Sequence, residues 1–141
     1  MEKINLYRMR RMMRATEKIT WRLEREKSKA ERTTSCRTGM PGNRRNYSRV
    51  EEGAIRICEL EDAFLDTVQA LDRMRKELAP CIDALENPDD RAVMRLRYMK
   101  GFGAEQIAEG MYMTDRMVYY ILARSEKQLA GRYPDRITEG R

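Results

Sequence analysis

The chain has 141 residues and a net charge of +6, and it is 37% charged but only 41% hydrophobic. Proline is scarce, runs of β-branched residues are absent, and no apolar run approaches the ~18 residues that a membrane span needs, so composition predicts an all-α cytoplasmic protein without a membrane segment. Three cysteines without metal-ligand spacing and the absence of histidine argue against a zinc site or a disulfide framework.

The first predicted element is one long helix over residues 2 to about 31, which contain no Gly or Pro. Residues 1–49 hold 15 Lys and Arg against 5 Asp and Glu. This basic segment is expected to lie on nucleic acid, or on the acidic middle segment of its own or another chain. The helix carries a rough apolar stripe, formed by Ile4, Tyr7, Met12, Ala15, Ile19 and Leu23.

A polar loop is expected at about residues 32–47, where the turn-forming residues gather. Ser48 and Glu51 have the spacing of a capping box, which predicts that a second long helix starts there. Pro80 should kink that helix or split it near residue 79. Residues 50–87 hold 4 basic residues against 10 acidic ones, so this helix is the acidic segment.

Apolar residues repeat every seven positions along the second helix, with a partner set three positions later. This heptad pattern indicates a coiled coil or a helical hairpin, because it places apolar side chains along one stripe of a helix. Whether the pairing is within one chain or between chains is left open by the pattern. The residues expected to form an oligomerisation seam are Ile57, Leu60, Phe64, Leu71, Met74, Leu78 and Leu85.

Residues 87–130 are predicted to form a domain of three short helices that ends in a helix-turn-helix. Asn87 and Pro88 are suited to start the first helix, and Gly101 to end it in the left-handed conformation. Gly103 can start the second helix, and Thr114 can cap the third. The sequence therefore predicts an all-α chain with two long helices over residues 1–86, this domain, and a frayed tail at 131–141.

Apolar spacing gives these three helices an inner face, to which the turn and third helix contribute Met113, Val118, Ile121 and Leu122. The third helix is left with an outer face in the arrangement of a recognition helix. No catalytic motif appears beside it: there is no phosphate-binding glycine loop, no nucleophile elbow and no paired carboxylates with metal spacing. The chain is therefore expected to be no enzyme and to need no cofactor, metal or small-molecule substrate.

Residues 91–129 resemble region 4 of bacterial sigma factors. The chain as a whole resembles short region-4-like proteins of phages and prophages of Gram-positive bacteria, with specific motifs only in its last ~45 residues. Tyr112 departs from the pattern, because it stands where a turn glycine is usual. The matching residues are Arg91, Val93 or Met94, Leu96, Arg97, Tyr98, Gly101, Glu105, Ile107, Ala108, Met113, Thr114, Val118, Ile121 and Leu129.

The resemblance implies a set of DNA contacts on the third helix and beside it. Arg116 is the best candidate for a guanine contact, because arginine can donate two hydrogen bonds to that base. Arg97 and Lys100 are further candidates for contacts with the DNA backbone. The residues expected on DNA from the third helix are Thr114, Asp115, Arg116, Met117, Tyr119, Tyr120, Arg124 and Lys127.

These observations predict a DNA-binding transcriptional regulator of a phage or mobile element, acting in the bacterial cytoplasm as a homo-oligomer, with a dimer favoured. Two alternatives stay open. A small terminase subunit of phage DNA packaging also combines a helix-turn-helix with an oligomerising segment, and it would form a ring. A protein that binds RNA polymerase or a sigma factor would not need to contact DNA, since sigma region 4 itself also contacts RNA polymerase.

Overall fold

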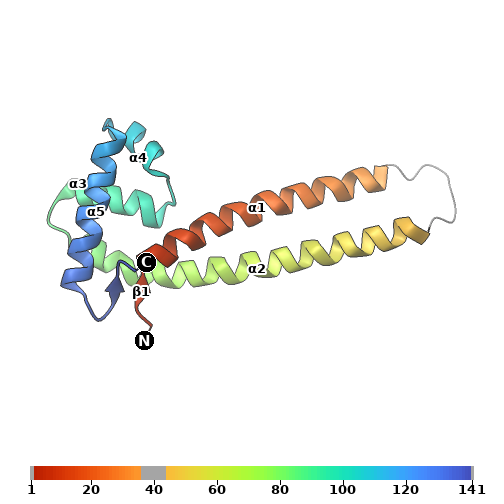
Figure 1. Cartoon of the computed structure of the whole chain (residues 1–141), viewed down its shortest axis with the longest axis horizontal. Helices are drawn as coiled ribbons and strands as arrows, with labels where there is room; N and C mark the ends of the chain where they lie inside the picture. Colours follow the sequence, from red (N-terminus) through yellow and green to blue (C-terminus); the bar gives the residue numbers. More distant parts are fainter. Residues whose placement is uncertain (1, 36–43, 141) are drawn as a thin grey trace. The chain divides into compact units, whose positions relative to one another are not determined.

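A computed structural model describes residues 2–35 and 44–140 of the chain. These residues are mostly helical, so the all-α prediction is confirmed (Figure 1). The elements in chain order are β1 (Ile4–Asn5), α1 (Leu6–Ser35), α2 (Arg44–Asp83), α3 (Pro88–Met94), the π-helical turn η1 (Arg95–Met99), α4 (Ala104–Met111), α5 (Asp115–Arg132) and β2 (Ile137–Thr138).

The chain forms two compact units. The hairpin unit is Arg14–Gln69, and the terminal unit is Met1–Met13 together with Ala70–Arg141. The boundary expected at residue 86 therefore differs from the observed division. The start of α1 and the second half of α2 belong to the terminal unit, because their apolar side chains lie in its core.

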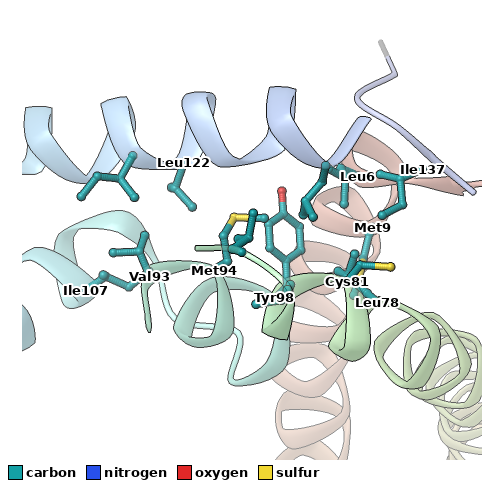
Figure 2. Packing of buried hydrophobic residues seen from close by; sticks show 14 of the residues in the cluster. Leu6, Met9, Leu78, Cys81, Val93, Met94, Tyr98, Ile107, Leu122 and Ile137 are labelled. Atoms are coloured by element: carbon teal, nitrogen blue, oxygen red, sulfur yellow. The ribbon is translucent and has the colours of Figure 1, made fainter. Parts of the chain in front are cut away.

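The core of the terminal unit gathers side chains from every helix of that unit and from β2. Tyr98 lies in the middle of this cluster and is fully buried (Figure 2). In the view of Figure 2, Met94, Val93, Leu122 and Ile107 lie on one side of its ring, and Leu6, Met9, Leu78, Cys81 and Ile137 lie on the other. Residues from both ends of the chain therefore share one hydrophobic core.

The tail is packed through Ile137, so the prediction that residues 131–141 are frayed was wrong for the described residues up to 140. Ile137 and Thr138 pair in parallel with Ile4 and Asn5, and Ile137 is 1% exposed. Burial of Ile137 stabilises the tail on the order of 2 kcal/mol, which a two-residue strand pair would not supply by itself. This contact was invisible in the sequence because a two-residue strand has no periodicity.

Several predicted helix boundaries also shift. The first helix begins at Leu6 and not at residue 2, since Ile4 and Asn5 are in β1. The second helix begins at Arg44, so the start predicted at Ser48 was wrong. Pro80 does not split α2, which continues to Asp83. The middle of the predicted 32–47 loop, residues 36–43, lies outside the described residues.

In the hairpin unit, α1 and α2 run antiparallel, and Lys27 Nζ lies 3.6 Å from Glu61 Oε1 across the pair (Figure 1). Over residues 50–69 of α2, the predicted heptad positions are half-buried, while the residues between them are exposed. The heptad residues of the hairpin unit are thus partly covered by the antiparallel pairing of α1 and α2 within one chain. The half-buried apolar residues of this pairing are Ile19 and Leu23 of α1 and Val50, Ile57, Leu60 and Phe64 of α2.

The later heptad residues of the expected oligomerisation seam belong to the terminal unit and not to the hairpin. Leu71, Leu78 and Leu85 are buried in the core of the terminal unit, and Met74 packs against that core. Leu85 also lies beyond the end of α2. Among the described residues, no helix is both long enough and apolar enough to cross a membrane.

Candidate functional site

The connection between α4 and α5 is three residues long, from Tyr112 to Thr114. Gly103 precedes α4, and its amide donates to Gln106 Oε1 at 3.1 Å, which satisfies one free amide of the helix start. The amide of Met113 donates to the carbonyl of Ala108 at 2.9 Å, so the connection folds back on α4. Ala108 is 2% exposed, and its small side chain lets the neighbouring helix approach closely.

The start of α5 is fixed by Thr114, as the sequence predicts. Its hydroxyl accepts a hydrogen bond from the amide of Met117 at 3.2 Å, and Asp115 in the first turn complements the positive end of the helix. One face of α5 is buried through Val118, Ile121, Leu122, Ser125 and Leu129. The predicted inner face of the third helix is therefore confirmed at Val118, Ile121 and Leu122.

The opposite face of α5 carries most of the residues that sequence reasoning assigned to DNA. Met117, Tyr119 and Tyr120 are 44%, 60% and 59% exposed, which is unusual for large apolar side chains and marks them as available for contact. The other exposed members of the predicted set are Thr114, Asp115, Arg116 and Lys127.

Arg124 differs from the rest of the set because its guanidinium is already bound within the unit. Its Nη2 atom donates to Asp90 Oδ1 at 2.5 Å, and the guanidinium lies 5.4 Å from the centre of the Tyr120 ring. Asp90 is 2% exposed, and the hydrogen bond to it raises the pKa of Arg124. The guanidinium of Arg124 therefore links the ring of Tyr120 to Asp90 at the start of α3. Because it already has these partners, it is poorly placed to bind a DNA phosphate.

The two further candidates for backbone contacts lie within η1 and just after it. Arg97 Nη1 donates to the carbonyl of Phe102 at 3.0 Å, which ties the guanidinium to the connection before α4. Lys100 is exposed and precedes Gly101, whose φ of 76° confirms the predicted left-handed turn. Of this pair, Lys100 is the more open cation.

A polar cluster that sequence reasoning missed joins the start of α1 to η1 and α5. Arg10 Nη1 donates to Tyr98 Oη at 2.9 Å and to Glu126 Oε1 at 2.7 Å, and the Tyr98 hydroxyl donates to the same carboxylate. Burial raises the pKa of Tyr98 well above its usual range, and Glu126 adds to this effect. These residues are far apart in the sequence, so no spacing pattern could have revealed the cluster.

A polar cleft of about 450 Å³ lies between the start of α3 and the second half of α5. Its lining includes Asp90, Arg124 and Arg132. Arg132 Nη1 donates to the carbonyl of Ala84 at 2.9 Å, and Arg124 is bound to Asp90. Both cations of the cleft thus have partners inside the unit, which indicates a structural role for it.

Tyr112 is the one described residue other than glycine with a positive φ. Its φ of 56° and ψ of 40° are the left-handed helical conformation, which costs a residue with a β-carbon roughly 1–2 kcal/mol. Its side chain is 98% exposed, so it gains no packing in return. We therefore expect Tyr112→Gly to raise the free energy of unfolding by about 1 kcal/mol.

Urea denaturation followed by circular dichroism measures that change. Tyr119→Gly is the matched control, because it removes the same side chain from a right-handed position inside α5. It should lower the free energy of unfolding by about 0.5 kcal/mol, the difference in helix propensity between Tyr and Gly. Equal losses of stability in both variants would show that position 112 carries no conformational cost.

Comparison with known proteins shows which family the chain belongs to. A family model described as a protein of unknown function (DUF1492) matches residues 52–130, from α2 to the last turns of α5. No curated protein matches the chain, and no solved structure matches it. The matched residues make up more than half of the sequence and include α3, α4 and the exposed face of α5. The chain belongs to the DUF1492 family.

Proposed function

We propose that α4 and α5 form a helix-turn-helix and that the terminal unit binds double-stranded DNA with α5 in the major groove. The observation that carries this proposal is the exposed face of α5, which starts at a capped N-terminus and projects from a helix whose other face is fully buried. A helix held in this way by a second helix and a short connection is the arrangement of recognition helices.

The spacing of the exposed cations on α5 supports the same proposal. Arg116 and Lys127 are eleven residues apart, which is three turns of helix, so both lie on the same side at a separation of about 16 Å. In a recognition helix the N-terminal residues contact base edges, so Arg116 is suited to a base and Lys127, three turns further along the same side, to a phosphate. Tyr120 and the small Ala123 lie between them and are exposed.

The resemblance to sigma region 4 would make the protein a transcriptional regulator of a phage or mobile element. The exposed face suits a moderate affinity, since Met117, Tyr119 and Tyr120 offer apolar contact with thymine methyl groups and few hydrogen bonds. Arg116 remains the candidate for direct contact with guanine.

The experiment is fluorescence anisotropy of a labelled duplex of about 30 base pairs, selected from a random-sequence pool by its binding to the full chain. The duplex is titrated with the full chain at several salt concentrations. Binding should weaken steeply as salt rises, because phosphate contacts release counterions. We expect Arg116→Ala to weaken binding about tenfold or more, in line with the loss of one base or phosphate contact of about 1–3 kcal/mol.

Lys76→Ala is the matched control, because Lys76 is an exposed cation of α2 in the same unit. Its loss should leave DNA affinity within about twofold, and both variants should keep the circular dichroism spectrum of the unmodified chain. Absence of any binding at the lowest salt concentration would overturn the proposal. Retention of purified RNA polymerase by a chain that binds no duplex would instead favour the protein-binding alternative.

A further inference from the structure

The described part of the hairpin unit has little buried apolar surface. In the part of Arg14–Gln69 whose side chains the structure describes, no side chain is fully buried. Large apolar side chains remain exposed on both helices, with Trp21 at 60% and Leu65 at 54%. Two helices side by side can cover their apolar stripes from one direction only, and such pairs are commonly completed by a second layer of helices.

A groove of about 560 Å³ opens between the two helices on one face of this unit. The residues that line it are Trp21, Arg22, Arg25, Glu26 and Lys29 of α1 and Arg56, Glu59 and Leu60 of α2. The apolar side chain of Leu60, which belongs to the heptad pattern, is thus reachable from this face. We name this surface the groove face.

The two helices carry opposite charges in this unit. Residues 14–32 of α1 hold seven cations against four anions, and residues 50–69 of α2 hold one cation against six anions. Arg22 of α1 and Glu59 and Asp66 of α2 form no ion pair within the described part of the chain. The groove lining is net basic along α1, where three cations stand against Glu26, which contacts Lys29 at 3.7 Å. Along α2, Arg56 and Glu59 line the groove, and Arg56 is paired with Glu52 of the same helix. Asp66 lies two turns beyond Glu59 on the same side of α2, so that side of α2 carries more acidic than basic charge.

We propose that the groove face binds the groove face of a second copy of this chain, with α1 of each copy lying on α2 of the other. Four helices then enclose the half-buried apolar residues of both hairpins. A two-fold axis parallel to the helices produces this arrangement, and it pairs basic edges with acidic edges twice. A two-fold axis across the helices would place α1 on α1, basic edge against basic edge.

The levels of the charged residues along the hairpin agree with the parallel axis. Lys27 and Glu61 contact each other, so they mark one level of the antiparallel pair. Counting five residues back on α1 and five forward on α2 places Arg22 level with Asp66, and counting two in the opposite sense places Lys29 level with Glu59. Rotation about an axis parallel to the helices keeps these levels, so each of these cations meets the acidic residue of the other copy.

The test uses charge reversal in two separate variants of the full chain. Variant one is Arg22→Glu with Lys29→Glu, and variant two is Glu59→Lys with Asp66→Lys. Sedimentation velocity should give the unmodified chain twice its mass of 16.7 kDa. Each variant alone should associate on the order of 100-fold more weakly, because four attractive contacts become repulsive ones.

An equimolar mixture of the two variants should restore the double mass, since each variant then presents the charges that the other lacks. This rescue can come only from contact between chains, because neither hairpin is repaired within itself. Glu17→Lys with Glu24→Lys is the control. Each of these residues is five positions from Arg22 or Lys29, which places it about 140° away around the helix, and neither lines the groove. The control should associate like the unmodified chain.

Circular dichroism of each variant confirms that its helices are formed before association is measured. An unmodified chain that stays at the single mass at all concentrations would overturn the proposal, and so would a ring of many copies. Failure of the mixture to associate, when the unmodified chain does, would also overturn it. None of these measurements contains DNA, so their outcome is independent of the proposed DNA binding.

Discussion

Tyr98→Ala is expected to lower the free energy of unfolding of the terminal unit by roughly 3–5 kcal/mol, the range for removing a large aromatic side chain from a core. Tyr98 is fully buried, with core side chains on both sides of its ring (Figure 2). Such a loss is a large fraction of the total stability of a small protein. Urea denaturation monitored by circular dichroism is the measurement.

Tyr98→Phe separates packing from hydrogen bonding. It keeps the ring and removes the hydroxyl that joins Arg10 to Glu126, while the Arg10–Glu126 ion pair of 2.7 Å can remain. The expected loss is about 1–2 kcal/mol, typical of a buried hydrogen bond with a charged partner. Similar losses for both variants would contradict the assignment of the larger effect to the cavity.

Periodicity in the sequence predicted the helices well because long helices repeat their apolar spacing over many turns. The heptads of α2 appear as its more covered positions, and Gly101 takes the predicted left-handed turn. The inner face of α5 also follows from spacing, since Val118, Ile121 and Leu122 are buried. The heptad repeat is the same on both sides of Gln69, so it could not predict that α2 is divided between the two units there.

The features that sequence reasoning missed depend on contacts between distant residues. Ile4 pairs with Ile137, and Arg10 reaches Tyr98 and Glu126, across most of the chain length. Arg124 was assigned to DNA from the family pattern, but the pattern holds no information on its partner Asp90, which is 34 residues away. Charge and spacing predict which residues share a face of a helix. Only the fold shows which side chains on that face already have partners within the protein.

Arg124→Leu should lower the free energy of unfolding by roughly 2–3 kcal/mol, because it leaves the buried carboxylate of Asp90 without its cation. The side chain of Asp90 is 3% exposed, whereas that of Arg124 is 33% exposed, so the cost falls mainly on the carboxylate. Lys127→Leu is the matched control, since Lys127 is an exposed cation on the same helix. It should change stability by less than about 0.5 kcal/mol.

The double variant Asp90→Leu with Arg124→Leu should recover most of that loss, to within about 1 kcal/mol of the unmodified chain, because no buried charge remains. A double variant as unstable as Arg124→Leu alone would show that lost packing, and not an unpaired carboxylate, sets the cost. The double variant also frees Tyr120 from the guanidinium that lies beside its ring. If Tyr120 contacts DNA in that fixed orientation, the double variant will be stable but will bind DNA more weakly, which separates the stabilising role of Arg124 from its role in holding the exposed face of α5.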